Sequence, residues 1–312
     1  MIIQNAGESI TFKGKTIYLD NGELTLSLLN IRDISEVKGL ENLKTLTGLD
    51  IRNNEISDLR GLASFKNLKE LDLDSNNIST ISDVKGLSLL TSLEKLDLSG
   101  NNISEIKGLE NLTNLRRLEL GNNKISEIKG LNKLINLKEL GLRSNQIKEI
   151  KDLDHLINLK YLDVDRNQIT AIKGIEKLTK LERLDLRENK LREISGLEKC
   201  TQLRILFLSK NQISTISGLN TLKELRELYL DENQITEITG LENCTNLEHI
   251  DLRYNLINKI SGLGTLKKLE WLYLSGQENN PLRVVLKELG KLSSVGYALE
   301  PQRFVRYSQQ ND

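Results

Sequence analysis

Residue types that build many functional sites are scarce in this chain. Its 312 residues include two cysteines, two prolines, two histidines, one tryptophan and one methionine. Two cysteines cannot form a disulfide framework, and two unpaired histidines supply neither a catalytic triad nor a His-rich metal site. Lys plus Arg balance Asp plus Glu at 44 each, so no net charge draws the chain to nucleic acid or to an anionic membrane. We therefore expect no catalytic residues, no metal and no cofactor.

Long apolar runs are missing as well. No segment approaches 18 consecutive apolar residues, and the start "MIIQNAGESI" lacks the basic and apolar regions of a signal peptide. We therefore expect a cytoplasmic protein with no membrane span. Gly14-Lys15-Thr16 is similar to the end of a phosphate-binding loop, but Ser9 stands where such a loop needs a glycine, and "TIYL" predicts a strand instead of a helix.

What the chain does contain is a repeat of 22 residues. The pattern L-x-L-x-x-N-x-I-x-x-I-x-G-L-x-x-L-x-x-L starts at residues 49, 71, 96, 118, 140, 162, 184, 206, 228, 250 and 272, with Ile at 250. Every step is 22 residues except the 25-residue step from Leu71 to Leu96, where residues 82–84 are expected to bulge. Eleven copies in register identify a leucine-rich repeat over about residues 27–276.

The spacing within each repeat predicts the fold. In L-x-L both leucines point to one face of a strand, so the residues before, between and after them point to solvent. The Asn that follows each strand is expected to satisfy buried backbone groups at the turn. The final period of three predicts short 3₁₀ or extended segments. Stacked repeats of this kind form an α/β solenoid, here a horseshoe of about 12 coils with a concave parallel sheet and short convex segments.

The two ends depart from the repeat. Residues 1–26 are predicted to form a β cap, with hairpin turns at Lys13-Gly14 and Asn21-Gly22. Residues 27–276 form the solenoid, and residues 277–312 a helical cap in which "NPLRVVLKELGKL" and "EPQRFVRYSQQ" are two short helices, the second starting at Pro301. Cys200 and Cys244 occupy a leucine position of the repeat, so we expect buried thiols; a redox or metal role is the alternative.

Aromatic residues are few, but half of them lie on the predicted solvent face of the strands. The repeats provide 44 such positions among 312 residues, so chance would place fewer than two of the twelve aromatics there. Six are found: Tyr161, Phe207, Tyr229, Tyr254, Trp271 and Tyr273. Together with His249, Asp185 and Asp251 they are predicted to bind a partner protein, because exposed rings with a charged rim are typical of binding hot spots. The alternative is that the rings shield one another or pack on the C-terminal cap.

Toward the N-terminus the same face is acidic. One row of it consists of Asp50, Asp72, Asp97 and Glu119. Over the 44 positions, 15 acidic residues stand against nine basic ones, which should repel nucleic acid and favour a basic partner surface. The alternative is a solvated face without a partner.

The repeat unit with the spacing of "ISEIKGLENLTNL" resembles two groups of proteins, the cytosolic leucine-rich-repeat regulatory subunit of type-1 protein phosphatase and the bacterial internalins. The terminal "PQRFVRY" is similar to the ends of archaeal repeat proteins. The first resemblance implies binding through concave acidic and aromatic residues, here Asp185, Phe207, Asp251, Trp271 and Tyr273. The C-terminal stretch departs from the cap of that family. Internalins carry a signal peptide, a helical N-terminal cap and anchoring domains, and we expect none of these here.

We therefore expect a non-catalytic interaction scaffold that is monomeric alone and binds another protein in its concave face. Nucleic acid and membrane are not expected partners. A self-assembling structural protein and an internalin-like surface ligand are the alternatives.

Overall fold

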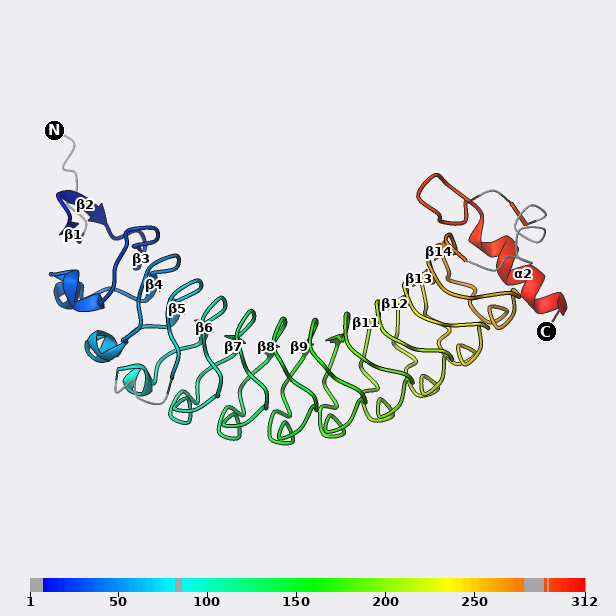
Figure 1. Ribbon diagram of the computed structural model, residues 1–312, viewed down its shortest axis with the longest axis horizontal. Helices are drawn as coiled ribbons and strands as arrows, with labels where there is room; N and C mark the ends of the chain where they lie inside the picture. The colour runs from blue at the N-terminus through cyan, green and yellow to red at the C-terminus, as the bar shows by residue number, and fades with distance from the viewer. Residues whose placement is uncertain (1–7, 82–85, 278–288, 291, 312) are drawn as a thin grey trace. The chain divides into compact units, whose positions relative to one another are not determined.

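The structure is a computed structural model, and it describes residues 8–81, 86–277, 289–290 and 292–311 (Figure 1). The chain divides into two compact units, residues 1–145 and 146–312. Each unit is a stack of coils built from the same repeat.

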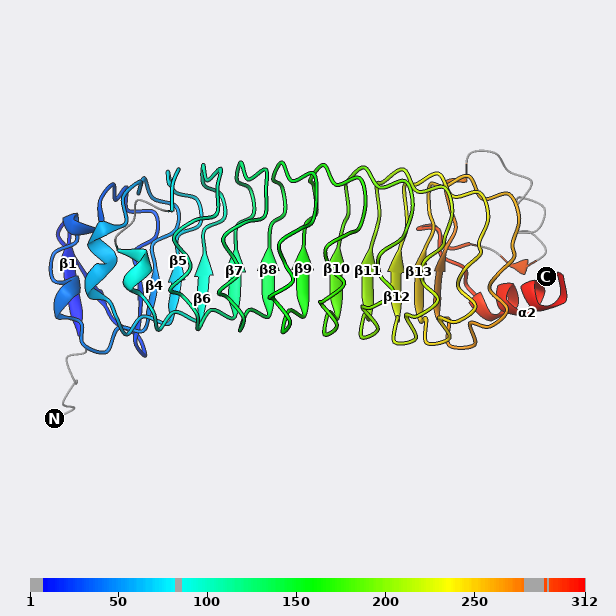
Figure 2. The ribbon, with the colours of Figure 1, turned by 90° about the horizontal axis from the view of Figure 1, so that it is seen from below.

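Each coil contributes one short strand to a parallel sheet (Figure 2). The strands of the first unit are β3 (Glu23–Thr25), β4 (Gly48–Asp50), β5 (Glu70–Asp72), β6 (Lys95–Asp97), β7 (Arg117–Glu119) and β8 (Glu139–Gly141). Those of the second unit are β9 (Tyr161–Asp163), β10 (Arg183–Asp185), β11 (Ile205–Phe207), β12 (Glu227–Tyr229), β13 (His249–Asp251) and β14 (Trp271–Tyr273). Neighbouring strands pair leucine to leucine, as Leu71 pairs with Leu96 and Leu184 with Leu206.

The repeat leucines form the core of both units. Leu118 and Leu120, the two leucines of one strand repeat, are both fully buried. Burial of one such side chain contributes about 1.5 to 3 kcal/mol before the cost of conformational entropy. Because no single coil can bury its own leucines, the stability of each unit comes from contacts between successive coils.

The segments opposite the strands are short, as the period of three predicts. In the first unit they include 3₁₀ helices at Ile34–Glu36, Leu40–Asn42, Arg60–Ser64 and Leu87–Leu89. In the second unit they are turns held by bonds between residues three apart, such as Leu203 N–H to the Cys200 carbonyl at 3.0 Å. The predicted α/β solenoid of parallel strands and short outer segments is therefore confirmed.

The asparagine of each repeat joins two coils through backbone groups, as expected. Asn101 is 6% exposed; its Oδ1 accepts the Ile78 N–H at 2.9 Å, and its Nδ2 donates to the carbonyl of Leu73 in the preceding coil and to that of Leu98, both at 3.0 Å. The ladder extends one step further than predicted. Gln277 stands 22 residues after Asn255 and makes the equivalent bonds, accepting the Ile257 N–H at 3.0 Å.

The N-terminal turns also follow the prediction. Strands β1 (Ser9–Phe12) and β2 (Lys15–Tyr18) form an antiparallel hairpin whose turn residues Lys13 and Gly14 have φ values of 48° and 79°. Asn21 and Gly22 make the second turn, with φ of 50° and 84°. Strand β3, which follows this turn, already pairs in parallel with β4. The sheet thus begins before residue 27.

The C-terminal end is covered by two segments. The first is the segment 296–298, which pairs along β14. The Leu274 N–H donates to the Gly296 carbonyl at 3.0 Å, and the Ala298 N–H donates to the Leu272 carbonyl at 2.7 Å. Helix α2 (Pro301–Asn311), red in Figure 1, begins at the expected proline, and its buried Ser308 Oγ accepts the Leu263 N–H at 3.0 Å.

Two of the expected features cannot be compared with the structure. The first expected C-terminal helix falls mostly on residues 278–288 and 291, and the expected bulge on residues 82–84, all outside the described residues. Cys200 and Cys244 are fully buried free thiols, as predicted, and burial raises the pKa of each to about 11. Within the described ranges, every helix is too short or too polar to cross a bilayer.

Candidate functional site

A continuous row of rings crosses the solvent-exposed strand face of the second unit. Phe207 stacks on Tyr229 with ring centroids 4.7 Å apart and planes at 12°. Tyr229 contacts His249 at 4.7 Å, and His249 contacts Tyr273 at 5.2 Å. These four residues come from four successive strands, β11 to β14, and are called the aromatic row.

His249 fills a gap in this row. In the register of the sheet, Asp251 stands between Tyr229 and Tyr273, where a carboxylate would interrupt the rings. Asp251 is instead 2% exposed and turned to Arg253, whose Nε donates to both of its oxygens at 3.0 Å. The imidazole of His249, two residues earlier on the same strand, lies between the two tyrosines in its place. Burial lowers the pKa of His249, because it disfavours the imidazolium.

The row ends against the C-terminal segment. Tyr297, which sequence reasoning missed, contacts Tyr273 at 5.7 Å and Trp271 at 5.3 Å, edge to face in both cases. The alternative interpretation is therefore right in part, since the rings do shield one another and one residue near the C-terminus does cover two of them. They are not hidden, however: Trp271 is 44% exposed, and Phe207, Tyr229 and Tyr273 are partly exposed.

The faces of the ring planes are covered by neighbours on both sides. Phe207 has Tyr229 on the β12 side and, on the β10 side, the guanidinium carbons of Arg183 and Arg187 at 4.7 and 4.9 Å from its ring centroid. Tyr273 has His249 on one side and Tyr297 on the other. The row therefore offers ring edges to a ligand, and it lacks the open faces on which nucleobases stack.

Asp185 and Asp251 do not form the exposed charged rim that the sequence led us to expect. Asp185 is fully buried, and the Nε of Arg187 donates to its two oxygens at 2.9 and 3.0 Å. Asp251 and Arg253 repeat this arrangement three coils later. In both cases the Arg two residues further on neutralises the carboxylate inside the face, so the exposed part of the pair is the guanidinium.

Tyr161 and Tyr254 lie on the strand face but outside the row. The Tyr161 hydroxyl donates to Asp163 at 3.3 Å, and burial is the main cause that raises its pKa. Tyr254 follows β13 with a φ of 54°, is 58% exposed and lies over Gly276, where a Cβ would meet its ring at 2.3 Å. Among the described residues, neither ring contacts another aromatic ring.

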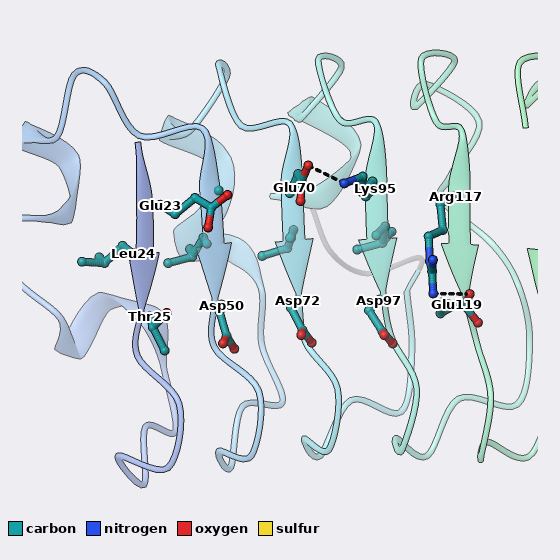
Figure 3. A pocket seen from close by; sticks show the side chains of 14 residues that line it. Glu23, Leu24, Thr25, Asp50, Glu70, Asp72, Lys95, Asp97, Arg117 and Glu119 are labelled. Atoms are coloured by element: carbon teal, nitrogen blue, oxygen red, sulfur yellow. Dashed lines mark ion pairs between the residues drawn. The ribbon is translucent and has the colours of Figure 1, made fainter. Parts of the chain in front are cut away.

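The predicted acidic row is present in the first unit (Figure 3). Asp50, Asp72, Asp97 and Glu119 are paired in register along β4 to β7 and line a shallow hollow of about 270 Å³. Three of the acids lie close to arginines of the face: Arg52 is 3.3 Å from Asp50 and 3.7 Å from Asp72, and Arg117 is 3.2 Å from Glu119. Burial raises the pKa of Asp72, and repulsion by Asp97 and Asp50 adds to the effect.

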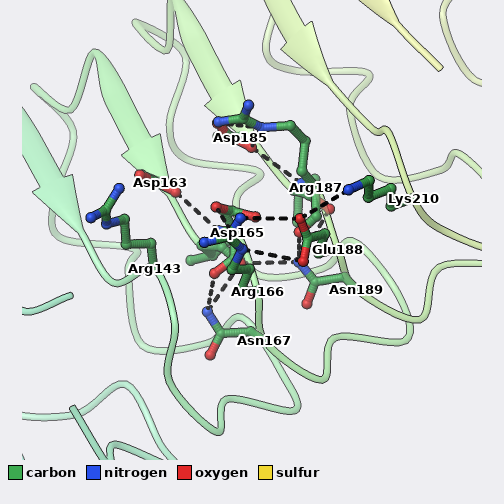
Figure 4. A network of polar contacts seen from close by, with 12 residues as sticks. Arg143, Asp163, Asp165, Arg166, Asn167, Asp185, Arg187, Glu188, Asn189 and Lys210 are labelled. Atoms are coloured by element: carbon green, nitrogen blue, oxygen red, sulfur yellow. Dashed lines mark hydrogen bonds and ion pairs between the residues drawn. The ribbon is translucent and has the colours of Figure 1, made fainter. Parts of the chain in front are cut away.

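A buried carboxylate, that of Asp165, lies on the strand face of the second unit (Figure 4). Asp165 is 7% exposed, and its Oδ1 is buried without a hydrogen-bond partner among the described residues. Burial, with repulsion from Asp185 and partial relief by Arg187, raises its pKa to about 6. Sequence reasoning missed this residue, because no motif distinguishes it from the exposed acids of the other repeats.

In the described part of the chain, no three His, Cys, Asp or Glu residues are grouped to hold a metal ion. His155 is exposed on an outer segment, remote in the repeat from the strand position of His249.

The repeat agrees with a known protein family. The family model described as Leucine Rich repeats (2 copies) matches residues 45–86, 91–133, 135–177, 157–199, 179–221, 201–243 and 223–264. Because these matches cover more than half of the chain, the protein belongs to the leucine-rich-repeat family. No curated protein matches the chain.

Several solved structures are similar. An internalin (inlF) from Listeria monocytogenes is 34% identical with a TM-score of 0.71, over 80% of this chain and 72% of that one. A leucine-rich-repeat protein of Leptospira interrogans is 28% identical with a TM-score of 0.63, over 80% and 70%. A chain from an octameric complex of Latrophilin 3, Unc5D and the leucine-rich-repeat protein FLRT2 is 28% identical with a TM-score of 0.63, over 70% and 71%. The predicted resemblance to internalins is confirmed, and the phosphatase-regulator role stays a prediction.

Proposed function

We propose that this chain is a non-catalytic binding protein whose strand face docks a partner protein, with the aromatic row and Trp271 as the anchor. The supporting observation is the row itself, four partly exposed rings in contact with one another on one face of a sheet whose other face is the core. A folded protein gains nothing from leaving such an apolar surface open, whereas a partner that covers it gains the burial. Extended surfaces of stacked repeats are generally used for protein interactions.

The acidic row of the first unit gives the proposed partner a preferred charge. Asp50, Asp72 and Asp97 repel one another across neighbouring strands, and a basic surface placed over them would relieve that repulsion. We propose that this row accelerates association with a partner that carries a basic patch on its surface. Salt would screen this attraction and slow association.

The finer assignments belong to the same proposal. We propose that the strand face is concave, that the unbound protein is monomeric and that it is cytoplasmic. The two buried free thiols, Cys200 and Cys244, support the cytoplasmic location. A regulatory role like that of the phosphatase subunit would use the same anchor. An internalin-like surface ligand is the second candidate, favoured by the 34% identity to an internalin over 80% of the chain.

An affinity pull-down tests the proposal. Immobilised wild-type protein and the Phe207→Ala/Trp271→Ala double variant would be compared for retained proteins from the native organism, by quantitative mass spectrometry. Each ring is expected to contribute about 2 to 4 kcal/mol to a complex, so the double variant should lose its specific partner. Ile157→Ala is the matched control, because Ile157 is 52% exposed but lies on an outer segment of the same unit.

Two outcomes would contradict the proposal. Recovery of the same proteins in the same amounts by the double variant would place the binding site elsewhere. Light scattering that shows size growing with concentration, and growth that stops in the double variant, would instead assign the rings to self-assembly.

A further inference from the structure

Arg183 is held in an unusual position on the strand face. It is the first residue of β10, and its guanidinium carbon lies 4.7 Å from the ring centroid of Phe207 on β11 and 5.2 Å from that of Tyr161 on β9. Two rings on the flanking strands thus restrain one exposed cation. Attraction between the cation and the ring electrons stabilises this placement without using any of its N–H donors.

The charge balance of the face singles out the same residue. The other basic side chains of the second unit's strand face all have a carboxylate partner: Arg166 pairs with Glu188, Arg187 with Asp185, Lys210 with Glu188 and Glu232, and Arg253 with Asp251. Among the described residues, the Arg183 guanidinium makes neither an ion pair nor a hydrogen bond; only the backbone N–H of this residue donates, to the Lys160 carbonyl at 3.0 Å. A guanidinium that is positioned but has no acceptor is a ready receptor for an anion.

The neighbourhood limits the kind of anion. Asp163 lies on the adjacent strand, two residues after the Tyr161 that contacts Arg183, and its pKa is raised by burial and by the nearby Asp185. The carboxylates of Asp163 and Asp185 would repel an incoming phosphate group, which carries about −1.5 to −2 charges. They would repel an incoming carboxylate, with its single charge, less strongly. Beside Arg183, Ile205 and the edge of Phe207 are partly exposed and apolar. The surface therefore combines one cation with an adjoining apolar ridge.

Resting on the proposed function, we propose that Arg183 is the recognition point for an acidic side chain of the partner. A polypeptide segment would place one Asp or Glu carboxylate on the Arg183 guanidinium and pack large apolar side chains along the edges of the aromatic row. Because the ring faces are covered, the ligand is held by edge contacts and by this single ion pair. Its sequence should thus carry an acidic residue next to apolar ones.

Selection from a random peptide library tests this inference with a defined probe. Phage-displayed 12-residue peptides would be selected on the immobilised full chain, and the enriched peptides synthesised and titrated by fluorescence polarisation. We expect an Asp or Glu within a few residues of two large apolar side chains. Arg183→Gln should weaken binding at least tenfold. Arg183→Lys should recover only part of it, since a Lys ammonium cannot present a planar fork.

A double-mutant cycle separates a direct contact from a general charge effect. Changing the acidic residue of the peptide to its amide should weaken binding to wild-type protein but cost little more on Arg183→Gln. Arg166→Gln is the matched control, because it removes an exposed positive charge that Glu188 already balances. It should leave peptide affinity within about twofold of wild type.

Every contrary outcome is informative. Enriched peptides without acidic residues, no enrichment at all, or losses that add fully in the cycle would overturn the role of Arg183. Tighter binding of a phosphoserine peptide than of its glutamate counterpart would overturn the choice of a carboxylate. If Phe207→Ala abolishes partner capture while Arg183→Gln leaves both capture and peptide binding unchanged, the inference fails and the proposed function stands.

Discussion

The imidazole of His249 stacks on the phenol ring of Tyr273 with centroids 5.2 Å apart, and its Nε2 is buried without a hydrogen-bond partner among the described residues. Both facts favour the neutral form. The charged and titratable groups that act on it are Asp251, Glu227 and Arg253, and together they do not outweigh the effect of burial, so the pKa lies below its ordinary value.

The first prediction concerns this titration. In the unfolded chain His249 takes up a proton near pH 6.5, while in the folded protein it resists doing so until lower pH. The free energy of unfolding should therefore fall as pH falls through 6.5, and His249→Phe, which keeps a ring but does not titrate, should lack that part of the loss. Denaturant unfolding at several pH values measures it. Proton NMR of His155→Gln, which leaves one imidazole, should show the lowered pKa directly; an unshifted His249 would contradict the packing.

Adjacent asparagines give the second prediction. Asn101 is buried and bonds to backbone groups of two coils, whereas the side chain of Asn102 is exposed. Asn101→Ala would leave the Ile78 N–H and several carbonyls unsatisfied, and should lower the free energy of unfolding by about 2 to 4 kcal/mol. Asn102→Ala should change it by less than about 0.5 kcal/mol. Equal effects of the two substitutions would show that the ladder is not a source of stability.

The third prediction concerns Asp165. Its folded pKa of about 6 lies above the ordinary 3.8, so the folded state disfavours the ionised form, and wild type carries this penalty above pH 6 and loses it near pH 4. Asp165→Asn should therefore stabilise the protein by about 1 to 3 kcal/mol at pH 7.5 and by almost nothing at pH 4. Thermal unfolding at both pH values provides the measurement.

A matched control exists for that substitution. Asp74 occupies the same repeat position in another coil, but it is partly exposed and accepts the Ser75 hydroxyl at 3.1 Å. Asp74→Asn should therefore give no gain in stability at pH 7.5. If both substitutions stabilise the protein equally, the cause is a general excess of negative charge on the strand face. The buried Oδ1 of Asp165 would then not be the cause.

The fold was predictable because each feature recurs in every repeat. Leu118 and Leu120 had to share a face once the strand was recognised, and the buried position of Asn101 follows from the need to satisfy a turn inside the core. Even Gln277 could have been found, since it stands 22 residues after Asn255. The separation of the chain into two caps and one solenoid stays a prediction, because the structure divides it only into two compact units.

Only the face to which each site residue points could be predicted from the sequence. Alternation along the strand placed Phe207 and Tyr229 side by side, as found. It could not show that Asp251 would turn inward onto Arg253 and leave room for His249, because alternation gives the face of a side chain and not its rotamer or its ion-pair partner. Tyr297 lies beyond the repeats, so no period indicated that it would meet Tyr273.

The fourth prediction separates core from surface at two neighbouring residues. Leu206 is fully buried between coils, whereas Phe207 is partly exposed and held by Tyr229 and two guanidiniums. Leu206→Ala should lower the free energy of unfolding by about 2 to 5 kcal/mol through the cavity that it leaves. Phe207→Ala removes one ring stack and should cost only about 0.5 to 1.5 kcal/mol, because little buried volume is lost. Chemical denaturation followed by circular dichroism measures both, and a larger loss for Phe207→Ala would mean that the aromatic row serves the fold first and binding second.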